Sequence, residues 1–287
     1  MSSLATVAVK ADGLKIDKKT GAATVLFYLP QRAFDQIAEV CVEHQDRLTG
    51  AQTGTLKTKD AVVPAGRLLD IVASRNPVIN LFGRMLAELP STNVDGAVQV
   101  AHAFTVHASD PQVDFFTAVD DITHDSDETG SGHMNSAEFA AGTFYRYASV
   151  NLADLADNLD GDHATALELT EQFLAAFITS LPQAKKNSTA PFTVPELAYV
   201  TVRSDRPVSL ASAYEAAVRA YGADGYAEPA RRALADHAER IYRLLGADGL
   251  LHHAHASIDD KAFAALGDKS DSFSTLIAEA IQHARPA

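Results

Sequence analysis

The sequence predicts an α+β fold with an antiparallel sheet, on three observations. Strand-like and helical apolar patterns are mixed along the chain without the strict alternation of parallel sheets. The stretch Val98 to Val106 alternates with period two, which indicates a strand with one buried face. Two further strands, Gln112 to Val119 and Phe139 to Val150, flank a long polar segment, as in an exposed hairpin. No clear linker divides the 287 residues, so we expect a single domain with a projecting hairpin.

The N-terminal part predicts one strand and two helices. The run Ala23 to Leu29 (ATVLFYL) is apolar and β-favouring and ends at Pro30, which predicts a buried strand. Apolar residues between Arg32 and Leu48 follow the i, i+3, i+4, i+7 spacing of an amphipathic helix. A second helix is predicted from Pro64 to Ser74, with the proline in its first turn.

The C-terminal part is richer in helices. Asp162 is placed to cap a helix from His163 to Leu181. A strand is predicted at Leu197 to Arg203. Further helices are predicted at 209–221, 228–245 and 272–284.

The totals limit the class of protein. With 24 basic and 37 acidic residues the net charge is −13, which argues against a nucleic-acid binder that relies on bulk charge but leaves room for a local groove. The single cysteine, Cys41, excludes an internal disulfide or a zinc site built from cysteines. No apolar run approaches a membrane span and no secretory signal is recognisable, so we expect a cytoplasmic protein with no membrane partner.

Residues that could carry catalysis are weakly patterned. The acidic stretch from Asp120 to Glu128 lacks EF-hand spacing, and a solvated loop is the better interpretation. The tract His252, His253 and His255 has no second ligand set and is expected in a surface loop. The sequence has no nucleophile elbow, phosphate-binding loop or dinucleotide fingerprint. We therefore expect no catalysis, no resident metal and no cofactor, with a metal-dependent phosphohydrolase at Asp120 and its neighbours as a minor alternative.

Three short groups could contact nucleic acid. They are Arg84 with Met85, the basic loop from Lys185 to Asn187, and Arg146 between two tyrosines. Lysine and arginine pair with phosphate, while methionine and tyrosine stack on or wedge beside bases. The alternative interpretation is half-buried strand packing for the tyrosines and an ordinary solvated loop for the lysines.

Several long motifs occur in one order along the chain. They are GRMLAELPSTNVDGAVQVAHAFTVHASDPQVDFFTAVDD (83–121), NSAEFAAGTFYRYASVNLADL (135–155), AKKNSTAPF (184–192) and RPVSLASAYEAAV (206–218). Together they resemble the CasC family, the backbone subunits of the type I-E CRISPR surveillance complex called Cascade. The similarity extends over roughly residues 22 to 225.

The resemblance implies a hand-shaped fold and an assembly. A palm like an RNA-recognition motif, with a ferredoxin-like antiparallel sheet, would span 83–112 and 148–225. Helical fingers would span 22–82, a protruding hairpin thumb 113–147, and C-terminal helices 226–287. Copies would stack along guide RNA as a helical filament, and each thumb would displace a base at the next copy. The implied partners are guide RNA, other copies of the chain, other Cascade subunits and, through the complex, target DNA.

The resemblance also implies RNA contacts. The loop from Gly83 to Asn93 would lie against the RNA backbone, the loop from Lys185 to Ser188 would make a second contact, and the thumb tip would occupy 121–136. The expected RNA-binding residues are Arg84, Met85, Ser91, Thr92, Asn93, Thr117, His133, Met134, Arg146, Lys185, Lys186 and Asn187.

One departure from the family concerns the start of the chain. Family members begin with a strand and a basic segment that this sequence does not contain, so we expect it to lack the family's N-terminal segment. Loss of that basic segment leaves a second interpretation open, a remnant that contacts partner subunits without gripping RNA.

Overall fold

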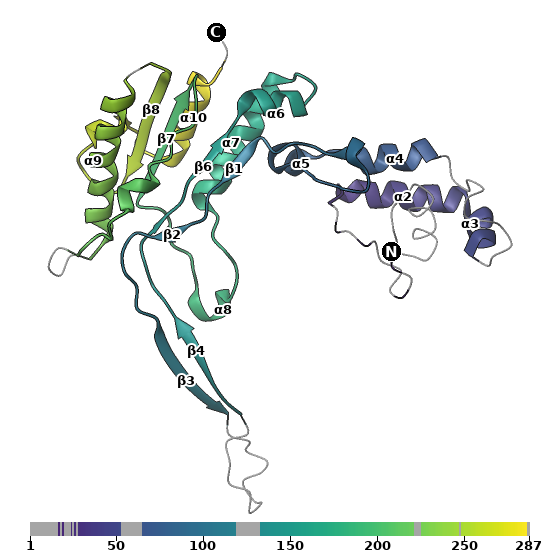
Figure 1. The fold of residues 1–287 in the computed structure, drawn as a ribbon, viewed down its shortest axis with the longest axis horizontal. Coiled ribbons are helices and arrows are strands. Elements are labelled where there is room, and N and C mark those ends of the chain that lie inside the picture. The colour runs from purple at the N-terminus through teal and green to yellow at the C-terminus, as the bar shows by residue number, and fades with distance from the viewer. Residues whose placement is uncertain are drawn as a thin grey trace, which may run out of the picture. The chain divides into compact units, whose positions relative to one another are not determined.

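The computed structural model describes residues 17, 19, 24, 26, 28–52, 65–118, 133–220, 225–246 and 248–285. The chain divides into two compact units, which are described separately below. Unit 1 contains residues 1–99 and 149–173, and unit 2 contains residues 100–148 and 174–287. Helices and short sheets alternate irregularly along the chain (Figure 1), so the predicted α+β fold class is confirmed.

The first helices described in unit 1 are α2 (Gln31–Glu43), α3 (Gln45–Gln52) and α4 (Ala65–Ala73). Their contact is apolar, and it buries Ala33, Ile37, Val40, Cys41, Leu48, Leu68 and Ile71. The buried α2 positions follow the helical period, as predicted. The single helix predicted over 32–48 is divided at His44, whose backbone leaves helical geometry with φ −111°.

The buried strand predicted over residues 23–29 is wrong at the positions that the structure describes. Leu26 and Tyr28 are 83% and 68% exposed and belong to no strand. A β-favouring sequence forms a strand only where a partner supplies hydrogen bonds and covers one face. Among the described residues no segment does so here.

Further helices follow in unit 1, and the last of them continues past residue 173 into unit 2. Helix α5 (Pro77–Phe82) begins at Asn76, whose Oδ1 accepts a hydrogen bond from the Ile79 amide at 2.8 Å. A 3₁₀ turn, η1 (Pro90–Thr92), and helix α6 (Leu152–Asn158) follow in sequence. Helix α7 (His163–Thr179) starts as predicted, because Asp162 Oδ1 accepts from the Thr165 amide at 3.0 Å.

Two predicted strands are each broken into short pieces. Strand β1 (Val98–Val100) pairs with β6 (Ala148–Val150), and β2 (Phe104–Thr105) pairs antiparallel with β5 (Phe144–Tyr145). The longer strands β3 (Gln112–Ala118) and β4 (His133–Phe139) form a separate antiparallel ribbon. Period-two patterning located β1 and β2 within the strand predicted from Val98 to Val106 but did not show where one pairing ends and the next begins. Strand β4 was not predicted, because it lies almost wholly in the polar segment before Phe139, where the second strand of the hairpin was expected to begin. Its pairing with β3 makes this polar segment a strand.

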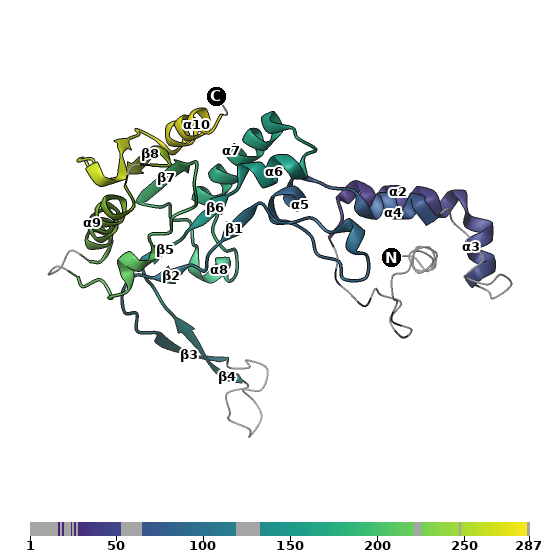
Figure 2. The same ribbon diagram turned by 45° about the horizontal axis from the view of Figure 1, so that its top comes forward.

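The main sheet of unit 2 has three strands. Strand β7 (Leu197–Arg203) pairs antiparallel with β8 (Leu250–Ser257), and β8 pairs parallel with the short β9 (Asp268–Lys269). His253 of β8 contacts Tyr242 of helix α9 (Ala227–Leu245), whereas His252 stacks on His283 of α10 (Phe273–His283). Since neighbouring strand residues point to opposite faces, α9 and α10 cover opposite faces of the sheet (Figure 2).

Two predictions for unit 2 are wrong. The histidine tract is strand β8 rather than a surface loop, and His255 is fully buried there. The helix predicted over 209–221 is reduced to the 3₁₀ turn η3 (Ala211–Tyr214). Beyond it the Val218 amide donates to the Val106 carbonyl at 2.9 Å, so this segment uses its backbone groups on a neighbouring segment.

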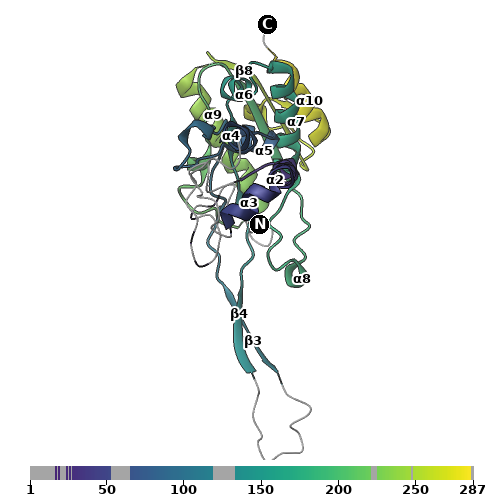
Figure 3. The same cartoon turned by 90° about the vertical axis from the view of Figure 1, so that its right-hand side faces the viewer.

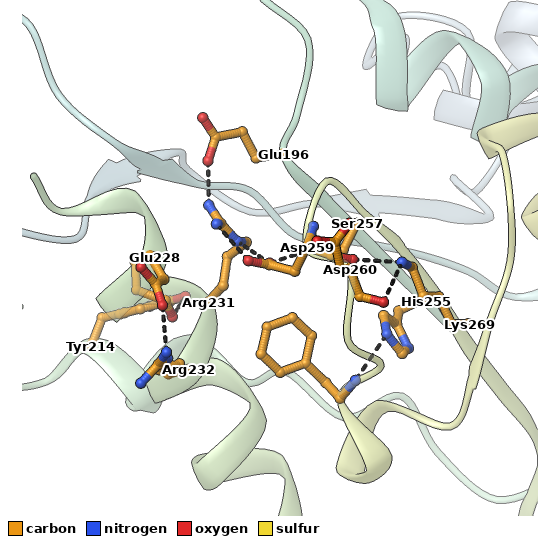
Figure 4. Close-up of polar contacts among 12 residues, drawn as sticks. Glu196, Tyr214, Glu228, Arg231, Arg232, His255, Ser257, Asp259, Asp260 and Lys269 are labelled. Atoms are coloured by element: carbon orange, nitrogen blue, oxygen red, sulfur yellow. Dashed lines mark hydrogen bonds and ion pairs between the residues drawn. The ribbon is translucent and has the colours of Figure 1, made fainter. Parts of the chain in front are cut away.

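An ion-pair cluster ties α9 to the sheet. Buried Arg231 donates to both carboxylate oxygens of Asp259, at 2.9 Å for Nη2, and also contacts Glu196 (Figure 4). Hydrogen bonding to Arg231 holds the pKa of Asp259 below its ordinary value. Beside the cluster, His255 Nε2 accepts a hydrogen bond from the Phe263 amide. Two short helical turns complete the elements described, α8 (Lys186–Thr189) and η4 (Ala264–Leu266).

Among the described helices, none combines the length and the apolar character that crossing a bilayer requires.

Candidate nucleic-acid interface

The loop from Gly83 to Asn93 in unit 1 is built around Arg84. This arginine is 5% exposed, and its guanidinium donates to the carbonyls of Thr92 at 2.9 Å, Ser74 at 3.1 Å and Ala73 at 3.2 Å. Burial, and then the charge of Arg75, lower the pKa of Arg84. A guanidinium with these partners braces the loop from inside and presents no free donors for phosphate in this conformation.

Other residues of the same loop divide into inner and outer positions. Thr92 is buried and donates to the Leu89 carbonyl at 2.9 Å, and Asn93 Oδ1 accepts from the Leu86 amide at 2.6 Å. Ser91 is exposed, and Met85 is 80% exposed. The surface of this loop that a ligand can reach is therefore formed by Met85 and Ser91, held in place by the inner residues.

Gly83 explains the sharp entry to the loop. Its φ is +78°, and an added Cβ would lie 2.7 Å from both the Gly96 nitrogen and the Val94 oxygen. A side chain at this position would be strained and would also clash with the backbone opposite.

The β3–β4 ribbon of unit 2 is exposed on both faces. It stands as a two-stranded arm whose contacts with the rest of its unit begin at its base (Figure 3). Phe115 is 71% exposed, Met134 65% and Val113 59%. The register pairs Thr117 with Met134 and puts Val113, Phe115, Thr117 and Met134 on one face. Two strands with no covered face are marginal in water, which indicates that this face has a partner.

The ribbon and its surroundings carry only acidic formal charge. Residues 109–144 contain no lysine or arginine and eight acidic residues, which are Asp110, Asp114, Asp120, Asp121, Asp125, Asp127, Glu128 and Glu138. The acidic stretch 120–128, most of the expected thumb tip 121–136 and the His133 side chain lie outside the described residues. With this charge the segment as a whole repels phosphate, so any grip on RNA here is steric or apolar.

Arg146 follows strand β5 and is turned toward helix α7. Its guanidinium donates to the carbonyls of Ser180 at 2.8 Å and Phe177 at 3.0 Å, and lies 5.1 Å from the Phe177 ring centre. These carbonyls belong to the end of the helix, where the last four lack internal partners. Arg146 thus caps α7, and its neighbour Tyr145 packs against Phe104 and has a pKa raised by burial.

The basic loop is the most accessible cationic group among the predicted residues. Lys185, Lys186 and Asn187 are all exposed, and Lys185 directly precedes α8 with a left-handed φ of +53°. Nearby, residues 179–181, 183 and 191–194 line an open hollow. Phe192 borders the hollow and is 76% exposed. Sequence reasoning did not single out Phe192, although an aromatic residue close to two lysines was a visible signal.

The predicted residues are divided between the two units. The loop residues Met85 and Ser91 belong to unit 1, whereas the ribbon and the basic loop belong to unit 2. Within unit 2, Arg146 is used in a helix cap and Lys185–Asn187 remain open to solvent. Among the described residues, no group of three or more histidine, cysteine or acidic side chains is arranged to hold a metal ion, the tract in β8 included.

Comparisons with solved structures and with family models both found matches to this chain. Two of the similar solved structures are as follows. One, described as "CRISPR RNA-guided surveillance complex, pre-nicking", is 44% identical with a TM-score of 0.85, and the match covers 99% of this chain and 79% of the other. The second, described as "CRISPR RNA-guided surveillance complex", is 37% identical with a TM-score of 0.73, over 98% of this chain and 76% of the other. A search of curated proteins found no match. The family model for CT1975-like proteins matches residues 1–281, and the chain therefore belongs to the CT1975-like protein family.

Proposed function

We propose that this protein is a backbone subunit of a type I-E Cascade complex, of the CasC type, that binds guide RNA without catalysing a reaction. Three findings support the proposal. The chain belongs to the CT1975-like family, and the two solved structures reported above are described as RNA-guided surveillance complexes. The observation that carries most weight is the two-faced, solvent-exposed ribbon, since such an arm gains stability only by contact with another molecule.

In this proposal the contacts are divided by chemistry. Lys185 and Lys186 pair with phosphate, Asn187 contacts sugar or phosphate, and Phe192 stacks on a base. Met85 and Ser91 line the RNA backbone, while Arg84, Thr92 and Asn93 act indirectly by holding their loop. A subunit that must accept any guide sequence is expected to use such contacts and to avoid reading base edges.

The ribbon acts as the thumb in the same proposal. Its apolar face, with Thr117 and Met134 near the described end, contacts the next copy and wedges between bases, at a cost of a few kcal/mol for each unstacked step. Head-to-tail contacts of this kind generate open helical filaments. This proposal includes the division of the chain that the resemblance implied. The fingers are 22–82, the RNA-recognition-motif-like palm is 83–112 with 148–225, the thumb is 113–147 and the C-terminal region is 226–287.

The basic loop provides the direct test. The double variant Lys185→Ala with Lys186→Ala is expected to weaken binding of single-stranded RNA to the same degree for unrelated sequences. Each lost phosphate contact should reduce the slope of log affinity against log salt by about 0.7, so by about 1.4 for the pair. Fluorescence anisotropy titrations over a series of salt concentrations measure both quantities.

A control with the same change of charge is Arg240→Ala with Lys261→Ala, two exposed residues elsewhere in unit 2. It should leave the slope close to that of the parent chain. Binding that does not respond to salt would contradict the proposal. Copurification with Cascade subunits without any RNA affinity would instead favour the interaction-only alternative, to which the acidic ribbon also points.

A further inference from the structure

The ribbon does not continue the β2–β5 pairing. Thr105 pairs with Phe144, and the next pair in register is Gln112 with Phe139. Six residues, 106–111, lie between these pairs on the first strand, but only four, 140–143, lie between them on the second. The unequal lengths make the base of the ribbon irregular, and we call these two segments, 106–111 and 140–143, its root. The direction of the ribbon depends on the contacts that hold the root.

One backbone hydrogen bond at the root is replaced by a side chain. The Val106 amide donates to the Thr143 carbonyl at 2.9 Å, as in a regular antiparallel pair. The Val106 carbonyl accepts from the Val218 amide at 2.9 Å and not from the Thr143 amide, so the return bond of the pair is missing. The Thr143 amide donates instead to Nε2 of His107 at 3.0 Å.

The His107 ring is held in the form that this bond requires. It is 8% exposed, and its Nδ1 lies 2.7 Å from the Ala108 carbonyl, so Nδ1 carries the proton and Nε2 is the acceptor. The ring stacks on Tyr226 at the start of α9, with centres 3.8 Å apart and planes at 10°. Three neighbours therefore fix one side chain at the point where the ribbon leaves the rest of unit 2.

Next to the ring, Gly142 leaves the space that this arrangement needs. An added Cβ there would lie 2.8 Å from Thr105 Cγ2 and 3.7 Å from His107 Nε2. The Ser109 hydroxyl donates to the Ala141 carbonyl at 2.9 Å, which adds a second link between the two segments on the side nearer the ribbon.

We propose that His107 is the positioning residue of the ribbon. By accepting the Thr143 amide, the neutral imidazole links the two irregular segments and sets the direction in which the ribbon is presented to a neighbouring copy. The functional part of this inference rests on the proposed filament role, whereas the structural part is independent of RNA.

The structural part is tested by hydrogen exchange resolved to single amides on the full chain. His107→Phe keeps an aromatic ring against Tyr226 but removes the acceptor, and His107→Gln returns an acceptor near the Nε2 position. Exchange of the Thr143 amide is expected to be about fivefold or more faster in the phenylalanine variant and to recover in the glutamine variant. The Val218 amide, whose acceptor is a backbone carbonyl, serves as the internal reference.

Equal Thr143 exchange in all three proteins would overturn the inference, as would equal acceleration of Thr143 and Val218, which indicates general loosening. The functional part is tested by measuring the cooperativity of binding to a long RNA. His107→Phe should lower this cooperativity and His107→Gln should restore it. The affinity for a short RNA, which binds a single copy, should be the same in all three proteins. Unchanged cooperativity in a parent chain that binds RNA would reject the positioning role. Failure of the parent chain to bind RNA would reject the proposed function. The exchange data would still show whether His107 holds the base of the ribbon.

Discussion

At the scale of single residues, two arginines expected to contact RNA make other bonds. Arg84 and Arg146 both direct their guanidinium groups to backbone carbonyls, one inside a loop and one at the end of α7. The same forked set of donors suits phosphate and clustered carbonyl oxygens equally well. Sequence can therefore identify arginine at these positions but not the acceptor that each one meets.

The role of Arg84 leads to a stability prediction. Replacing it with methionine leaves the carbonyls of Ala73, Ser74 and Thr92 without their donor and should lower the free energy of unfolding by about 2 kcal/mol or more. Met85→Ala, at the exposed neighbouring position, should change it by less than about 0.5 kcal/mol. Urea unfolding measures both, and an Arg84→Met protein of unchanged stability but weaker RNA binding would refute the bracing role.

At the scale of secondary-structure elements, β8 shows how a histidine-rich tract becomes part of a core. Alternation along the strand turns His253 and His255 toward α9 and η4, and His252 toward α10. Burial lowers the pKa of all three histidines. A tract that reads as polar is thus half-buried at His252 and His253 and fully buried at His255, and burial favours the neutral imidazole.

The buried strand predicts a loss of stability in mild acid. Because burial lowers the pKa of His255 below its ordinary value of 6.5, the unfolded chain binds this proton more readily than the folded chain. Its contribution to stability is complete above about pH 6.5 and declines as the pH falls from there toward the lowered pKa. Urea midpoints measured from pH 8 to pH 5 should fall less steeply for His255→Gln than for the parent chain. Parallel pH dependence in the two proteins would contradict this.

At the scale of the whole molecule, charge is unevenly distributed along the chain. Residues 109–144 carry eight of the 37 acidic residues and none of the 24 basic ones. A chain that binds RNA with this distribution must overcome repulsion at the ribbon with local contacts elsewhere. The acidic ribbon also resists non-specific pairing of an otherwise apolar, exposed pair of strands.

Neutralising the ribbon should therefore strengthen RNA binding. Asp114→Asn with Glu138→Gln is expected to raise affinity roughly two- to fivefold at low salt, and the gain should disappear as salt screens the charges. Asp236→Asn with Glu239→Gln makes the same charge change at exposed positions of α9 and should have a smaller effect. Equal gains from both pairs would assign the effect to net charge alone.

The sequence by itself determined the features that arise from local signals. Strand-like runs located β3 and β7, the helical period identified the buried face of α2, and Asp162 marked the start of α7. The family motifs likewise led to the surveillance-complex assignment that the comparisons support at the level of the family. The exposure of Lys185 to Asn187 was also predictable, since they lie between elements that were recognised, although Lys186–Thr189 form the short helix α8 and not a loop.

Only the tertiary structure decided what depends on residues far apart in the chain. The buried state of Arg84, the cap made by Arg146 and the acceptor role of His107 each require a partner brought near by folding. So do the burial of β8 and the loss of the helix after Ser209. Propensity and periodicity are properties of neighbouring residues, whereas the partner of a hydrogen bond or the cover of a strand is set by the packing of the whole unit.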